Sequence, residues 1–142
     1  MDIIFCTAGD LWVAAQTAWG EARNQGEQGL AAVLWVIRNR HVYHRRWKQH
    51  SLTSICQEPL QFSCWNVGNP NLAQLQQVLL TDTIFRQALH LALDVYSVTA
   101  STTSLVGKST HYYVAGSRMP LWASGRTPYV QIKDHLFFER IA

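Results

Sequence analysis

Eight consecutive apolar residues, Leu30 to Ile37, restrict the fold of this chain more than any other feature. No side chain in this run is polar, so the segment is apolar all round and must be buried on most sides. A strand can also carry such a run, but the polar ends and the total length favour a helix. We therefore predict a largely buried helix from about Glu27 to Arg40.

Length and composition predict a single globular domain over residues 1–142. The chain is 48% hydrophobic and 15% charged, which allows a proper core and excludes a disordered chain. Twelve Lys and Arg residues against nine Asp and Glu residues give a net charge of +3. This mild positive charge suits an anionic polymer as a partner, nucleic acid included.

Local signals predict further helices before residue 99. Thr7 and Asp10 form a capping box for a helix that runs to about Ala22. Asn71 and Asp82 are expected caps of two later helices, the second with a clear apolar stripe. The expected later helices span 51–56, 72–80 and 83–98. Breaker residues and Ser/Thr-rich composition predict loops at 58–71 and 99–109.

After residue 109 the pattern changes to β. A strand is expected at 110–114, and two more at 129–133 and 136–140 form a hairpin. On a strand, His111 and Tyr113 share one face and Tyr112 lies on the other. The pattern leaves open which face lines a cleft. The expected fold is therefore α+β, mainly α, with a small antiparallel sheet near the C-terminus.

Glu21 is a candidate general acid. It lies on or beside an apolar stripe, where partial desolvation favours the protonated form of a carboxylic acid. The alternative is a structural glutamate at a helix end, paired with Arg23 or Arg38, and spacing alone slightly favours that alternative. The stripe consists of Leu11, Ala14, Ala15, Ala18 and Ala22.

Three blocks of residues resemble the SleB/CwlJ-type cell wall hydrolases, a family named for spore cortex-lytic enzymes. They follow the order of the family and extend over nearly the whole chain. The resemblance implies a lysozyme-like domain that cleaves the glycan of peptidoglycan, with Glu21 as the catalytic residue. The blocks are Trp19–Arg23 with Gly26–Gly29 and Arg38–Arg40; Gln61–Trp65; and Thr110–Tyr113 with Pro120–Ala123.

The second and third blocks contain the candidate substrate-binding residues. Amide and hydroxyl groups can hydrogen-bond sugar hydroxyls or acetamido groups, and flat aromatic rings can stack on sugars. We expect one groove that contains these residues and Glu21. Trp65 has a structural alternative as a core residue. The candidates are Gln61, Ser63, Trp65, His111, Tyr113 and Trp122.

Hydrolysis of a glycosidic bond usually needs a second carboxylate. Glu27 and Asp82 are the nearest, and neither is well placed. This favours a lytic transglycosylase, in which one carboxylate acts twice, over a muramidase. Three alternatives stay open: a metal-dependent amidase using His41, His44 and His111, a non-catalytic peptidoglycan-binding module, and a nucleic-acid-binding protein using the basic segment 38–50. Because no HExxH or comparable pattern occurs, we expect no metal and no cofactor.

The first six residues lack the basic region of a secretory signal, and no apolar run reaches the roughly 18 residues of a membrane span. We expect a protein made in the cytoplasm without a signal peptide, which reaches the wall by a phage-type release, as an endolysin does. Cys56 and Cys64 are expected to be reduced there. The expected partner is the peptidoglycan glycan strand, bound by a monomer, with no nucleic acid and no stable membrane association.

Overall fold

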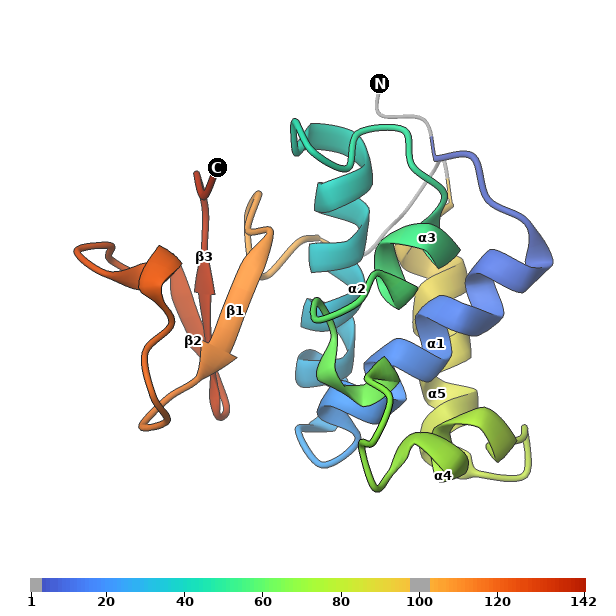
Figure 1. The fold of residues 1–142 in the computed structure, drawn as a ribbon. Helices are drawn as coiled ribbons and strands as arrows, with labels where there is room; N and C mark the ends of the chain where they lie inside the picture. The colour runs from blue at the N-terminus through green and yellow to red at the C-terminus, as the bar shows by residue number, and fades with distance from the viewer. Residues whose placement is uncertain (1–3, 98–102) are drawn as a thin grey trace.

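The computed structural model describes residues 4–97 and 103–142. A body of helices carries a small sheet along one side (Figure 1). The predicted α+β fold, mainly α, is confirmed. The elements in chain order are α1 (Ala8–Ala22), α2 (Gly26–Tyr43), α3 (Leu52–Gln57), the 3-10 helix η1 (Ser63–Trp65), α4 (Leu72–Gln77), α5 (Thr83–Val95), β1 (His111–Val114), the 3-10 helix η2 (Leu121–Ala123), β2 (Val130–Ile132) and β3 (His135–Phe138).

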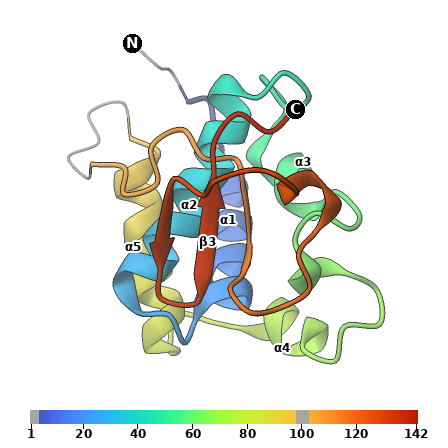
Figure 2. The ribbon, with the colours of Figure 1, turned by 90° about the vertical axis from the view of Figure 1, so that its left-hand side faces the viewer.

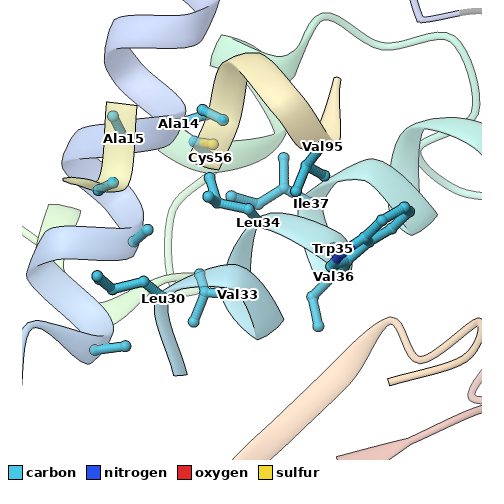
Figure 3. Packing of buried hydrophobic residues seen from close by; sticks show 14 of the residues in the cluster. Ala14, Ala15, Leu30, Val33, Leu34, Trp35, Val36, Ile37, Cys56 and Val95 are labelled. Atoms are coloured by element: carbon cyan, nitrogen blue, oxygen red, sulfur yellow. The ribbon is translucent and has the colours of Figure 1, made fainter. Parts of the chain in front are cut away.

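Helix α2 lies at the centre, between the other helices and the sheet (Figure 1). Every residue of its apolar run, 30–37, is buried, which confirms the predicted helix; it extends beyond the expected bounds to Gly26 and Tyr43. In Figure 3, Leu34 and Ile37 point toward Cys56 and Val95 of helices α3 and α5. An eight-residue run without polar side chains is tolerated because both sides of the helix are covered.

Side-chain caps fix the ends of the helices around α2. Thr7 and Asp10 make the predicted capping box, and Asp10 also accepts hydrogen bonds from the backbone and the hydroxyl of Thr53, which ties the start of α1 to α3. Asp82 caps α5 by accepting from the Phe85 amide at 2.9 Å. Asn71 is at the predicted N-cap position of α4, but its side chain makes no cap bond, and α4 ends at Gln77 instead of near Leu80. Helix α5 ends at Val95, before the predicted end near residue 98, and part of the predicted loop at 99–109 lies outside the described residues.

The sheet has the strand order β1-β3-β2, and both pairings are antiparallel. Tyr112 and Val130 both face Phe137 of the central strand in register. Figure 2 shows the sheet lying across α2. The predicted hairpin is confirmed, although β3 begins at His135, and its turn contains Lys133 at a φ of 52°. Phe137 is fully buried and joins the sheet to the helical core.

The basic segment 38–50 is buried only in its first part, since Arg45, Arg46, Lys48 and His50 are exposed. Arg40 is only 4% exposed, and its guanidinium lies 4.1 Å from the ring centre of Trp47 and 4.8 Å from that of Phe62. It donates from Nε to the Thr110 carbonyl at 2.8 Å and from Nη1 to Gln61 Oε1 at 3.2 Å. Arg40 therefore joins α2 to β1 and to the 58–71 loop, and the interleaved aromatic and basic residues serve packing here.

Within residues 4–97 and 103–142, every helix is too short or too polar to serve as a membrane span. Cys56 and Cys64 are both buried and are not joined by a disulfide. Burial raises the pKa of Cys56 to about 12, so this thiol stays protonated at neutral pH.

Candidate active site

A pocket of about 510 Å³ lies where the end of α1 meets the 58–71 loop and strand β1. Among the described residues that line it, Glu21 alone carries a carboxylate. The other lining residues combine aromatic rings with amide, hydroxyl and imidazole groups. They are Gly20, Arg40, Leu60, Gln61, Ser63, His111, Tyr112, Tyr113, Val114, Trp122 and His135.

The carboxylate of Glu21 accepts three hydrogen bonds. Tyr112 donates its hydroxyl to Oε1 at 2.6 Å, and Oε2 accepts from the Cys64 amide at 3.2 Å and from the Ser63 hydroxyl at 3.3 Å. Donors from two distant segments therefore hold one half-buried acid in one orientation, as a catalytic group requires.

Glu21 is not paired with an arginine. The guanidinium of Arg23 lies 4.5 Å from the ring centre of Trp19, and that of Arg38 lies 5.0 Å from the ring centre of Trp35. The two arginines considered as structural partners of Glu21 thus stack on tryptophans of their own helices. Within the described part of the chain, the only ion pair joins Arg46 to Glu58.

Gly20 permits the close approach of η1 to α1. A Cβ atom at position 20 would lie 2.7 Å from Cys64 Cβ and 2.9 Å from Cys64 Sγ, distances that real Cβ atoms do not adopt. The absence of a side chain on Gly20 therefore allows the Cys64 amide to reach Glu21. Trp65, the last residue of η1, also holds this helix against α1, because its Nε1 donates a hydrogen bond to Thr17 Oγ1 at 2.8 Å.

Tyr112 is a functional candidate that the sequence analysis missed. Its ring is packed against Phe137, with ring centres 5.3 Å apart, and against His135 at 4.9 Å. Burial, followed by the negative charge of Glu21, raises the pKa of Tyr112 well above 10. The hydroxyl therefore keeps its proton and donates a hydrogen bond to the Glu21 carboxylate. A tyrosine in the third block was visible, but nothing local indicated its partner 91 residues away.

His111, Tyr113 and Trp122 form an aromatic wall of the pocket. The ring centre of Trp122 lies 5.0 Å from that of His111 and 6.0 Å from that of Tyr113. Burial, with a further contribution from the charge of Arg40, lowers the pKa of His111 to about 3, so its ring is neutral at pH 7. The wall is therefore an uncharged surface on which a sugar ring can stack.

His135 lies beneath Tyr112 as a second missed residue. It is 5% exposed, and burial lowers its pKa. In the described part of the chain its Nδ1 has no hydrogen-bond partner. His135 is therefore a neutral imidazole in the same pocket as Glu21.

The structure brings six of the seven candidate residues to one pocket. Trp65 is the exception: it does not line the pocket and packs against the core beside Thr17. Its predicted position in the groove was wrong because its indole N–H is satisfied by a core threonine. The six that line the pocket are Glu21, Gln61, Ser63, His111, Tyr113 and Trp122.

The other carboxylates and the histidines considered from the sequence have different surroundings. Glu27 is exposed at the start of α2, and Asp82 caps α5 while accepting from Trp19 Nε1 at 3.2 Å. His41 and His44 each use one ring nitrogen on a backbone carbonyl. No group of three or more His, Cys, Asp or Glu residues within residues 4–97 and 103–142 is arranged to hold a metal ion.

We expect the free energy of unfolding to decrease as the pH falls below 6.5. Burial lowers the pKa of His111 from 6.5 to about 3 in the folded protein. Between these values the unfolded chain binds a proton that the folded chain does not, so folding is disfavoured increasingly as the pH drops. Urea denaturation at pH values between about 6.5 and 4 measures this slope. A His111→Gln variant should show a shallower slope, and a slope equal to that of the parent would contradict the assignment.

A sequence model described as cell wall hydrolase matches residues 24–138. The chain belongs to the cell wall hydrolase family. The resemblance to the SleB/CwlJ-type enzymes is thereby confirmed. The matched segment begins three residues after Glu21, so it contains the whole second and third blocks and supports the fold around the pocket. No curated protein sequence matches the chain.

Two solved structures resemble this cell wall hydrolase over nearly its full length. The catalytic domain of the Bacillus cereus SleB protein has 21% identity and a TM-score of 0.73, and the match covers 95% of this chain and 93% of that one. The catalytic domain of the germination-specific lytic transglycosylase SleB from Bacillus anthracis has 22% identity and a TM-score of 0.70, with 94% and 96% covered. These matches establish a shared fold.

Proposed function

We propose that this cell wall hydrolase cleaves the glycan backbone of peptidoglycan between MurNAc and GlcNAc as a lytic transglycosylase, with Glu21 as its catalytic acid and base. One observation carries the proposal: Glu21, held by three donors, is the single carboxylate among the described residues of a pocket rich in aromatic and polar groups. The resemblance to a lytic transglycosylase domain from Bacillus anthracis supports it.

In the first step, protonated Glu21 donates its proton to the glycosidic oxygen while the bond from that oxygen to C1 of MurNAc breaks. Positive charge develops at C1 and the ring oxygen of MurNAc. The leaving GlcNAc carries the proton away as a hydroxyl group, and Glu21 becomes a carboxylate close to the positive sugar.

In the second step, the Glu21 carboxylate accepts the proton of the muramoyl C6 hydroxyl as its oxygen bonds to C1. The product is a 1,6-anhydro ring, and Glu21 regains the proton with which it began. No water is consumed, so no second carboxylate is needed to activate one. This route matches a pocket in which the described lining holds one carboxylate.

Tyr112 and Ser63 position the catalytic carboxylate. The two hydroxyls and the Cys64 amide contact both oxygens of Glu21, which restricts rotation of the carboxyl group. Charge-assisted hydrogen bonds of this kind favour the carboxylate that forms when the proton leaves. The same donors hold the carboxylate in position for the second step.

The remaining candidates are proposed to bind sugar residues on either side of Glu21. Gln61 Oε1 accepts a hydrogen bond from Arg40, and this bond orients the side-chain amide of Gln61. Its amide nitrogen is then available to donate to the acetamido carbonyl of a substrate. His111, Tyr113 and Trp122 provide the stacking surface. We do not include Trp65 in this set because its position is structural.

A muramidase is the second candidate function, since a water molecule in the same pocket would give a hydrolytic product. The amidase and binding-module alternatives predict different behaviour with purified peptidoglycan. We expect release of soluble glycan fragments at an equal rate with and without a chelator such as EDTA. An amidase that depends on metal would stop in the chelator, and a binding module would release nothing.

We further propose that the protein acts on the cell wall as a monomer, without a cofactor and without a nucleic-acid partner. The burial of Arg40 supports the last point, because its guanidinium is engaged with Trp47, Phe62 and backbone.

A further inference from the structure

A second pocket, of about 550 Å³, lies at the C-terminal end of α2, beside the start of β1 and the last residues of the chain. Figure 2 shows these three segments meeting at one edge of the molecule. We call it the basic pocket. Tyr43 and Ile141 contribute apolar surface to it, and its charged lining residues are Arg45, Arg46, Lys108 and Arg140.

The basic pocket concentrates positive charge. It holds four of the chain's twelve Lys and Arg residues, and no Asp or Glu side chain lines it in the described part of the chain; the one carboxylate in its lining is the terminal one of Ala142. Arg46 is paired with Glu58, with 3.1 Å between Nη2 and Oε1. Arg45, Lys108 and Arg140 are exposed and have no ion-pair partner within the described residues.

Helix stabilisation explains only part of this charge. Cations near the C-terminus of a helix are favoured by its dipole, which accounts for Arg45 and Arg46 just beyond α2. Lys108 precedes β1 and Arg140 follows β3, so the same reasoning does not apply to them. Lys108 lies with its Nζ 4.7 Å from the ring centre of Tyr43, which directs its charge over the apolar part of the pocket. An apolar floor with a cationic rim fits a ligand that carries both methyl groups and carboxylates.

The basic pocket is adjacent to the Glu21 pocket. Thr110 lines the former and His111, the next residue, lines the latter. The imidazole of His44 spans the boundary: its ring centre lies 5.6 Å from that of His111, and its Nε2 is hydrogen-bonded to the Ile141 carbonyl at 2.9 Å. The two pockets are thus separated by the packed imidazoles of His44 and His111, and a group attached to a sugar in the Glu21 pocket would pass over these rings to reach the basic pocket.

We propose that the basic pocket binds the carboxylates of the peptide stem attached to the muramoyl residue of the bound strand. This inference rests on the proposed function. The stem leaves the sugar through the lactyl group and contains alanine methyl groups as well as free carboxylates, which match the apolar floor and the three unpaired cations. The pocket thereby selects glycan that still carries its peptides.

The test compares two substrates for the Arg45→Glu/Lys108→Glu double variant. Both residues are exposed and lie outside the Glu21 pocket. On purified peptidoglycan from which wall polymers have been removed, we expect KM to rise about 10-fold with kcat unchanged, because attraction becomes repulsion at two positions. On glycan strands freed of peptides by an amidase, the variant should match the parent. Arg86→Glu/Lys133→Glu is the matched control, since it changes the net charge equally at exposed positions outside both pockets.

Three outcomes would overturn the proposal. An equal rise in KM on both substrates would show that these residues act on the glycan. A rise no larger than that of the control would show a general effect of net charge. A rise seen only when phosphate-containing wall polymers are left in place would assign the pocket to those polymers. If the parent protein itself cleaves neither substrate, the proposed function is refuted instead. Thermal melting of the variant verifies that it is folded.

Discussion

Glutamine in place of Glu21 is expected to reduce the rate of glycan cleavage by more than about 10²- to 10⁴-fold, the usual loss when one general acid is removed. The loss should exceed this range because the same group is proposed to donate a proton in the first step and to accept one in the second. Glutamine keeps the size of the side chain and accepts a hydrogen bond, but it cannot transfer a proton. The measurement is the initial rate of release of soluble fragments from purified peptidoglycan.

Folding of the Glu21→Gln variant should be nearly unaffected. The carboxylate is not part of an ion pair within the described residues, so its replacement leaves no buried charge without a partner. Urea denaturation should therefore give a free energy of unfolding close to that of the parent. Glu27→Gln, at an exposed position six residues later, is the matched control and should retain full activity. Parental rates from the Glu21 variant would eliminate it as the catalyst and leave Glu27 as the next candidate.

Replacement of Tyr112 by phenylalanine is expected to lower kcat by about 10- to 100-fold. The variant loses a hydrogen bond to a carboxylate, which contributes about 1.5–3 kcal/mol when one partner is charged, and about 1.4 kcal/mol corresponds to a tenfold change in rate. The phenylalanine ring can keep the contacts with Phe137 and His135, so the sheet should stay in place. Steady-state kinetics on soluble glycan chains would separate kcat from KM.

A positioning role for Tyr112 makes a second, independent prediction. Without this donor one oxygen of the Glu21 carboxylate is no longer held in place, so kcat should fall while KM stays close to that of the parent. Tyr113→Phe is the comparison, because Tyr113 lines the same pocket but, within the described residues, is not one of the hydrogen-bond donors to Glu21, and it is proposed to bind sugar. It should change KM more than kcat. A Tyr112→Phe enzyme with the kcat of the parent, or one that changes KM and leaves kcat unchanged, would refute the role of this hydroxyl.

The parts of the fold that could be predicted are those with strong local signals. The apolar run at 30–37 allowed only a buried element, and it lies at the centre of the core. Thr7 and Asp10, and later Asp82, predicted helix starts because a cap and its partner are three residues apart. The hairpin was visible as two alternating segments separated by a turn.

The composition of the pocket was only partly predictable, because its contacts join residues that are distant in sequence. Resemblance to a family pointed to Glu21 and the blocks around it, but the bond from Tyr112 crosses 91 positions and the anchor of Trp65 crosses 48. Strand alternation left open which face of β1 lines the pocket. β1 is an edge strand, and three successive residues, His111, Tyr112 and Tyr113, line the pocket.

Arg40 illustrates the same limit for charge. Its sequence neighbours are basic, which is typical of a solvated surface or a polyanion site. Trp47, one of the aromatic rings that bury it, belongs to the same segment, but Phe62 and the carbonyl partner at Thr110 come from two distant segments. A basic run therefore predicted neither the burial of this arginine nor its contact with Gln61 in the pocket.

Mass spectrometry of the fragments released from purified peptidoglycan tests the central claim most directly, because it reports which bond is cleaved and what replaces it. If Glu21 acts twice and no water enters, muramic acid ends should be 1,6-anhydro forms, lighter by one water than hydrolytic ends and resistant to borohydride reduction. Reducible muramic acid ends would contradict the lytic route and indicate a muramidase. Intact glycan with free peptide stems would contradict glycan cleavage altogether.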